Sequence, residues 1–275
     1  MMTQGQQQAL LALLRDADPT TVDLLKQELV DAGESRLEEY EDLLPGCGEV
    51  ASRHLQEVID RVRRSRWLSI ISCQLAEMES WRQLEEFCWT LARSEHSGLQ
   101  FGPYARQLDQ WASEVDSRLP EGAHAPAQVA ALVAVLANRK RFAGNQADYY
   151  HPRNCFLPWV IEFRQGIPLT LSLIYYLVGR RAGIPVTGIS APGHFLVRVD
   201  EVVFDPFFDG RQIDADEWAA IRDGMSEDKR SLLDEACPPR QMAHRLLLNL
   251  RNAYLKRKDQ ERTRRIDHYL AVLQR

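Results

Sequence analysis

The chain has 275 residues and a formal net charge of −5 at pH 7, and 45% of its residues are hydrophobic. This length suffices for a substantial core, and we expect two or three packed modules. Acidic and basic residues are mixed along the whole sequence. The charge therefore gives no reason to expect a nucleic-acid partner or binding to an anionic membrane.

The sequence shows no targeting signal or membrane span. No charged segment followed by an apolar one opens the chain, and no apolar run approaches the roughly 18 residues needed to cross a bilayer. We therefore expect a cytoplasmic protein with no membrane partner. Its five cysteines are an odd number and lack CxxC spacing, which argues against a disulfide framework or a zinc ribbon. Neither a metal nor another cofactor is expected.

Residues 1–65 are predicted to form a helical N-terminal module. Asp18-Pro19 ends one apolar-periodic segment and starts the next, and Gly33 closes that second segment. The phrase LLRDADPTTVDLLKQELVDAG resembles one unit of a HEAT-type helical repeat. A stable solenoid needs about three units, and only one clear copy is present, so HEAT-like pairing is a hypothesis.

Residues 66–136 are predicted to continue as helices. Ser80 and Gln83 have the spacing of a capping box at the start of a strongly periodic segment. Four tryptophans in this region, Trp67, Trp81, Trp89 and Trp111, are expected to pack in the core or between domains, and a ligand cage is the alternative. The irregular loop AGNQADYYHPRNC follows, and its Gly144-Asn145 suits a left-handed turn.

The next segment predicts a buried helix and a small sheet. Pro168 suits the first turn of a helix because proline lacks the amide hydrogen that would be unpaired there, and the residues that follow form a broad apolar face. Strands are predicted at PVTGIS, HFLVRV and VVFDPF, the last two joined by a turn at residues 200–201. Residues 237–275 predict a C-terminal helical hairpin.

The predicted strand hairpin brings one histidine close to one aspartate. A turn at residues 200–201 sets Val199 opposite Val202, which places His194 diagonal to Asp205 on the same face, with β-carbons roughly 7 Å apart. A carboxylate at this position would fix the tautomer and orientation of the ring, as the third member of a catalytic triad does. A structural interpretation stays open, because an aspartate before proline is also a common turn opener.

Five phrases occur in a specific order between Phe142 and Ile213: GN..DYYHPRN, RQGIPLTLS, GIPVTG, APGHFLVR and FDPFFDG. In this order they resemble the SirB-type branch of the transglutaminase-like superfamily, which is also found fused to an F-box in animal proteins. The resemblance implies an α+β fold, mostly helical, with a papain-like core of a buried helix packed on a small antiparallel sheet. We assign residues 66–236 to this domain.

The resemblance also implies roles for individual residues. His194 matches the family's histidine and Asp205 its acidic partner. The cysteine nucleophile of active relatives falls at Pro168, which has no thiol. Ser172, about one turn further along the helix, is a weak substitute because it would need a base and an oxyanion hole. Cys155 lies in the preceding loop and is expected to be a packed thiol.

Tyr150, Asn154 and Arg164 are expected to border the cleft, where an amide and a guanidinium could grip a carboxylate or a peptide backbone. Asn154 could instead cap the next helix.

The first functional hypothesis is a non-catalytic or atypical transglutaminase-like protein that binds a protein or peptide in the His-Asp cleft. The alternative is a hydrolase or transferase on an amide-type bond, with His194 as general base oriented by Asp205. A third hypothesis is a scaffold in which the pair only holds the hairpin.

Overall fold

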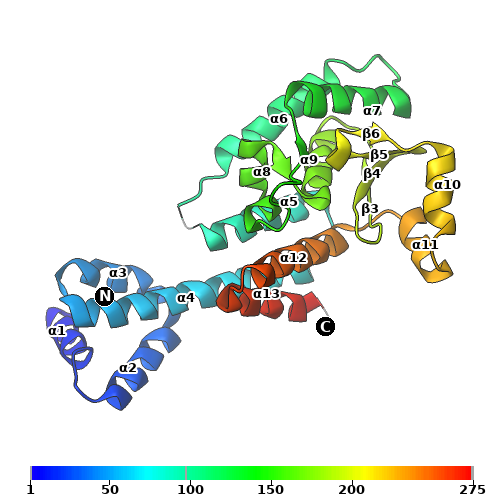
Figure 1. Cartoon of the computed structure of the whole chain (residues 1–275). Helices are drawn as coiled ribbons and strands as arrows, with labels where there is room; N and C mark the ends of the chain where they lie inside the picture. Colours follow the sequence, from blue (N-terminus) through cyan, green and yellow to red (C-terminus); the bar gives the residue numbers. More distant parts are fainter. Residues whose placement is uncertain (1, 97, 274–275) are drawn as a thin grey trace. The chain divides into compact units, whose positions relative to one another are not determined.

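The computed structural model describes residues 2–96 and 98–273 (Figure 1). Its internal contacts divide the chain into two compact units, Met1–Ile70 and Ile71–Arg275. The long helix α4 (Glu49–Ala76) begins in the first unit and ends in the second. The predicted domain boundaries at residues 65 and 236 stay predictions.

The first unit is helical. It contains α1 (Gln4–Leu13), α2 (Pro19–Asp31), α3 (Leu37–Leu43) and the beginning of α4, with 3-10 turns at Gly33–Arg36 and Leu44–Gly46. Helix α2 begins at Pro19, as the Asp-Pro signal predicted, and Asp18 caps it by accepting hydrogen bonds from the backbone amides of Thr20 and Thr21. Leu14, Tyr40 and Leu55 are fully buried in its core. The HEAT-like assignment stays a prediction.

The second unit is mostly helical with small sheets, so the chain has the expected α+β fold. Its helices are α5 (Trp81–Glu95), α6 (Gly102–Asp116), α7 (Ala125–Val133) with a π-helical extension at Ala134–Arg139, α8 (Leu157–Phe163), α9 (Pro168–Arg181), α10 (Ala215–Asp223), α11 (Glu227–Asp234), α12 (Pro239–Lys256) and α13 (Gln260–Leu273). None of the described helices is long and apolar enough to cross a membrane.

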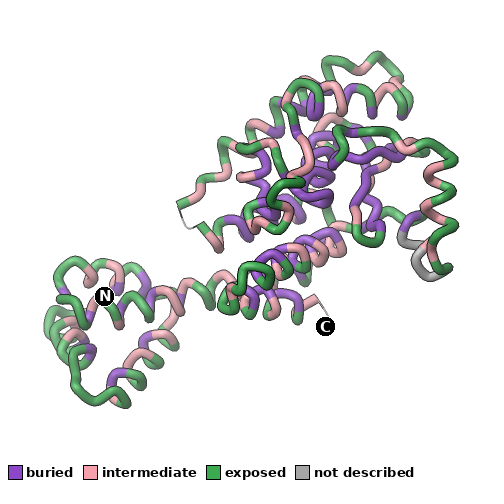
Figure 2. Tube along the Cα trace, viewed as in Figure 1, coloured by how far each residue is buried: buried purple, intermediate pink, exposed green. Residues whose placement is uncertain are grey.

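Helix α9 is the central element of this unit. Pro168 is its first residue, as predicted, and every residue from Pro168 to Gly179 is buried (Figure 2). The hydroxyl of Thr170 accepts a hydrogen bond from the Ile167 amide at 3.1 Å and donates one to the Asn154 carbonyl at 2.7 Å. These bonds satisfy a free amide at the helix start and tie α9 to the preceding loop.

A four-stranded antiparallel sheet follows α9, in the order β3-β4-β5-β6. Its strands are β3 (Thr187–Ile189), β4 (Leu196–Val199), β5 (Val202–Asp205) and β6 (Arg211–Gln212). The predicted hairpin register is confirmed, because Val199 pairs with Val202. The short strand β6 was not expected. A separate parallel pair joins β1 (Ala143–Gly144) to β2 (Gln165–Gly166).

Alternation along the strands covers both faces of this sheet. Leu196 and Val203 pack in a cluster with Leu233 of α11 and Trp218 of α10. Phe204, one residue further along β5, points the other way, and its ring lies 5.8 Å from that of Tyr175 in α9. The sheet therefore lies between α9 on one side and α10 and α11 on the other.

The chain ends in the predicted pair of helices, α12 and α13. Lys258, between them, has a left-handed backbone with φ of +59°. The apolar stripe of α12 packs inward, because all of its members are buried: Met242, Leu246, Leu247, Leu250 and Tyr254. Glu95 at the end of α5 forms ion pairs with Arg262 and Arg265 of α13. This carboxylate anchors the hairpin to the rest of the unit.

Candidate functional site

The structure brings His194 and Asp205 together. Nε2 of His194 lies 2.7 Å from Oδ2 of Asp205, and Oδ1 of Asp205 accepts a hydrogen bond from the Phe207 amide at 2.9 Å. The Asp205 side chain is 5% exposed and that of His194 is 28% exposed. Because an ionised carboxylate only accepts hydrogen bonds, the proton of the neutral ring resides on Nε2. Nδ1 is then an acceptor to which no described residue donates a hydrogen bond.

Two phenylalanines that follow Asp205 form a wall around the imidazole. The ring of Phe207 meets it edge-on with centroids 6.0 Å apart, and that of Phe208 lies at 6.2 Å. Phe208 is 48% exposed.

A β-carbon added to Gly144 would lie 2.6 Å from Phe207. The expectation of a left-handed turn at Gly144 is wrong, because the residue lies in β1 with no positive φ, and its lack of a side chain instead makes room for Phe207.

Arg245 of α12 holds the turn that carries the histidine. Its guanidinium donates hydrogen bonds to the Ser190 hydroxyl at 2.7 Å, the Ala191 carbonyl at 2.9 Å and the His194 carbonyl at 3.0 Å. It also lies over the Phe195 ring, and burial lowers the pKa of this arginine. Sequence reasoning missed Arg245. The available signal was a basic residue next to the buried stripe of α12.

We refer to His194, Asp205, Phe207 and Phe208 together as the corner. A hollow of about 160 Å³ lies near it. Its lining includes Tyr149, Tyr150, Ile167 and, from α12, Asn249 and Asn252. Tyr149 connects the hollow to the wall around the imidazole, because its ring centroid lies 6.2 Å from that of Phe207. The two asparagine side chains make no hydrogen bond to any residue that the structure describes, so their amides are available to a ligand.

The candidate nucleophiles lie in this region but offer no reactive group. Pro168 follows Ile167, which lines the hollow, and has no thiol. Cys155 also lines the hollow, but its burial raises its pKa to about 12, so the thiol is protonated at neutral pH. The Ser172 hydroxyl donates to the Phe195 carbonyl at 3.2 Å. Its proton is therefore directed at the backbone of β4.

Of the three predicted cleft residues, Tyr150 lines the hollow and is 49% exposed. Asn154 does not cap α8, whose N-cap is Phe156. Its amide nitrogen instead donates to the carbonyls of Asp148 and Tyr149, which fixes the loop beside the hollow.

The third predicted cleft residue, Arg164, is stacked among aromatic rings. Its guanidinium lies 4.6 Å from the Trp111 ring and 5.0 Å from the Phe142 ring, and burial lowers its pKa.

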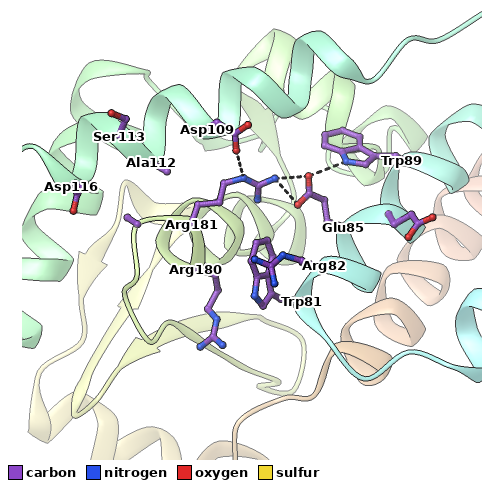
Figure 3. A pocket seen from close by; sticks show the side chains of 12 residues that line it. Trp81, Arg82, Glu85, Trp89, Asp109, Ala112, Ser113, Asp116, Arg180 and Arg181 are labelled. Atoms are coloured by element: carbon purple, nitrogen blue, oxygen red, sulfur yellow. Dashed lines mark hydrogen bonds and ion pairs between the residues drawn. The ribbon is translucent and has the colours of Figure 1, made fainter.

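A much larger hollow, of about 830 Å³, lies between α5, α6 and the end of α9 (Figure 3). Its central charges satisfy one another. Arg181 bonds both oxygens of Glu85 at 2.6 Å and Asp109 at 2.8 Å, and the indole of Trp89 donates to Glu85. Among the described residues, no group of three or more histidine, cysteine, aspartate or glutamate side chains is arranged to hold a metal ion.

Comparison with known proteins identifies the family. Residues 103–248, more than half of the chain, match the transglutaminase-like superfamily. The chain belongs to this superfamily. The matched part of this transglutaminase-like chain begins in α6 and ends in α12, so it includes His194, Asp205 and Arg245. No solved structure matches it.

Several curated proteins are similar to parts of the transglutaminase-like chain. A UPF0162 protein of Xylella fastidiosa (strain Temecula1) is 36% identical over 177 residues, which cover 60% of this chain and 62% of the relative. UPF0162 protein PA3419 of Pseudomonas aeruginosa is 29% identical over 54% of this chain and 56% of its own length. F-box only protein 21 of Mus musculus is 34% identical over 95 residues, 30% of this chain but 15% of that protein. The chain thus spans about three fifths, or less, of these relatives.

Proposed function

We propose that this chain is a non-catalytic or atypical transglutaminase-like protein of the SirB-type branch, and that it binds a protein or peptide beside His194 and Asp205. The similarity to F-box only protein 21 supports the assignment to this branch. The observation that carries the proposal is an oriented imidazole-carboxylate pair, 2.7 Å apart, next to a helix that begins with Pro168 instead of cysteine. The acyl-enzyme route through that position is closed.

The chemistry of the corner suits a polypeptide. The free Nδ1 of His194 can accept a main-chain N–H, and the unused amides of Asn249 and Asn252 can both donate and accept. The exposed rings of Phe208 and Tyr150 supply apolar area for a side chain. A peptide backbone alternates donors and acceptors and carries side chains at intervals, so it matches this combination.

Selection of displayed random peptides on the full chain tests the proposal. We expect peptides that bind reversibly and are recovered with unchanged mass, as measured by mass spectrometry. Phe208→Ala should weaken their affinity by about tenfold or more, because burial of a phenylalanine contributes roughly 2 kcal/mol. Fluorescence anisotropy of a labelled peptide measures this change.

Phe163→Ala is the matched control, because Phe163 is also an exposed phenylalanine, at 58%, but is not in ring contact with His194. It should leave the affinity unchanged. Equal losses in the two variants would contradict binding at the corner. If His194→Ala lowered the melting temperature while peptide affinity stayed constant, the pair would be a scaffold instead.

A second candidate function is a hydrolase or transferase on an amide-type bond. The pairing of His194 with Asp205 favours it, because this geometry orients the ring as a general base toward water. In this case recovered peptides would be cleaved or modified, and His194→Ala would abolish the change in mass. Ser172→Ala would leave it intact, because the Ser172 proton is directed at Phe195. An adduct on Cys155 with an electrophilic probe would contradict both functions.

A further inference from the structure

Two hollows are both lined by the short segment that contains His151 and Arg153. One, of about 220 Å³, also involves His96 and reaches the α12–α13 hairpin. The other, of about 190 Å³, extends past Trp159 of α8. Both include His151 and Arg153, and all of their lining residues lie in the second unit.

Arg153 is a cation without an internal partner. Its guanidinium forms no ion pair or hydrogen bond with any residue that the structure describes, and it is exposed. The carboxylates in and beside the hollow of about 220 Å³ already form ion pairs. Glu95 and Asp259 both pair with Arg262, and Asp148 pairs with Arg257 at 3.1 Å. Among the described residues, the Arg153 charge is therefore left uncompensated, at a position that lines both hollows.

The neighbouring imidazoles add hydrogen-bond donors. Nδ1 of His151 accepts a hydrogen bond from the Arg153 amide at 3.1 Å. The proton of the neutral ring must then reside on Nε2, which has no acceptor among the described residues. The ring of His96 is held against Trp159, with centroids 4.2 Å apart.

Burial lowers the pKa of both imidazoles, and repulsion from nearby arginines adds to this effect. The pKa of His151 is lowered by burial and by Arg257 and Arg153, against an opposing effect of Asp148. The pKa of His96 is lowered chiefly by burial; Glu95 opposes this effect, and Arg153 and Arg262 each contribute a smaller lowering. A negatively charged ligand here would relieve this repulsion and raise both pKa values.

We propose that Arg153, His151 and His96 form a binding site for an oxyanion, the phosphate or carboxylate group of a small organic molecule. The donors are present and unused, the carboxylates nearby are paired, and the space exceeds what one oxyanion needs, so it accommodates the organic part beside Trp159. This proposal does not rest on the peptide-binding function, because it uses neither His194 nor Asp205.

Calorimetric titration of the full chain with sulfate tests the site, because sulfate does not titrate near neutrality. We expect saturable binding that is stronger at about pH 6 than at about pH 8, since protonation of His96 and His151 adds positive charge. Arg153→Ala should weaken binding by about tenfold, the effect of losing one charge-assisted contact. Titrations with glycerol phosphate and with acetate then distinguish a phosphate from a carboxylate source.

Arg180→Ala is the matched control. Arg180 is also an exposed arginine of the second unit without an ion pair among the described residues, but it lies at the end of α9. Its loss should change sulfate affinity by less than about twofold, as expected for a distant surface charge. Equal weakening by both substitutions, or no saturable binding of sulfate, glycerol phosphate or acetate, would overturn the proposal. Melting curves of both variants verify folding.

Discussion

The two ends of α9 carry hollows of opposite character. Near its first turns, Ser172 bonds the backbone next to His194, and the adjoining hollow has a volume of about 160 Å³. At its last residue, Arg181 lies in a hollow of about 830 Å³. Ser172 and Arg181 are about 14 Å apart along the helix axis. The small hollow has unused amides and exposed rings, whereas the central charges of the large one are paired with each other.

Volume alone therefore does not tell which hollow has groups free to bind a ligand. Arg181 and Glu85 are 13% and 10% exposed, and each has partners at hydrogen-bond distance. A ligand entering there would have to break these bonds, or it would gain no contact with these charged groups. At the other end, the free Nδ1 of His194 and the amides of Asn249 and Asn252 would gain partners on binding.

Loss of Arg181 tests the structural character of the large hollow and should give the largest effect on stability. Arg181→Ala leaves Glu85 buried without its cation, and removal of one partner of such a pair costs about 3–5 kcal/mol. Urea unfolding measures the free-energy change.

The neighbouring Arg180→Ala variant is the control. Because Arg180 is exposed, its loss should change stability by less than about 0.5 kcal/mol. If Arg181→Ala were as mild, the charges would not hold α5 and α6 to α9, and the contrast between the two hollows would fail.

At the opposite end of α9, Asp205→Asn should change the tautomer of the imidazole. The two carboxylate oxygens accept from His194 and from the Phe207 amide, and an asparagine offers only one acceptor. If its oxygen keeps the Phe207 amide, its NH₂ faces the ring, and Nε2 must become the acceptor. We expect the ring proton to move to Nδ1, which long-range ¹H–¹⁵N NMR detects directly.

The same substitution should cost about 1.5–3 kcal/mol, because it replaces a hydrogen bond to a buried charged acceptor. Asp109→Asn at the other end of α9 is the control. The Asp109 side chain is 66% exposed in its pair with Arg181, so we expect a loss of at most about 1 kcal/mol. An unchanged tautomer in Asp205→Asn would show that the carboxylate does not set the protonation of the ring.

The sequence was sufficient to predict features that depend on local patterns. Pro168 marked the start of α9 because proline fits only a few helix positions. The two-residue turn after Val199 fixed the register of the hairpin, and the alternation of strand residues then brought His194 beside Asp205. The regular alternation of side chains along a strand made this prediction possible; no property of the two residues alone would have been enough.

Features that depend on distant packing could not be predicted. Arg245 follows His194 by 51 positions, and only the fold of α12 places it under the turn. Arg164 looked like a cleft cation, but aromatic rings from two other segments surround it. Asn154 looked like a ligand-binding amide, but nearby carbonyls use its donors. Local patterns report caps and periodicity, and they contain no information about such partners.

Gly144 offers a smaller test of how packing controls the corner. In Gly144→Ala the new methyl group would meet the Phe207 ring at 2.6 Å, so the ring must move. We expect a loss of about 1–2 kcal/mol, typical of overpacking, together with a shifted His194 ring resonance because Phe207 meets the imidazole edge-on. Gly5→Ala, where a β-carbon would meet nothing within 4 Å, is the control. An unshifted ring resonance would mean that Phe207 does not shape the corner.

The smallest expected effect is an acid-dependent loss of stability from His96 and His151. Both have a folded-state pKa below their ordinary value, chiefly because burial disfavours the charged ring. The unfolded chain therefore binds more protons as the pH falls through about 6.5, and stability decreases as the pH drops below that value. His151→Gln and His96→Gln should each flatten this slope in urea unfolding measured between about pH 8 and pH 5.

Sulfate connects this last effect to the comparison of the two hollows. If the anion binds beside Arg153, it favours the protonated imidazoles of the folded protein and should reduce the acid-dependent loss. Sulfate also stabilises proteins in general through exclusion from their surface, so the Arg153→Ala variant supplies the reference. A pH-dependent benefit of sulfate that persists in this variant would mean that the uncompensated cation, unlike the paired Arg181, has no ligand-binding consequence.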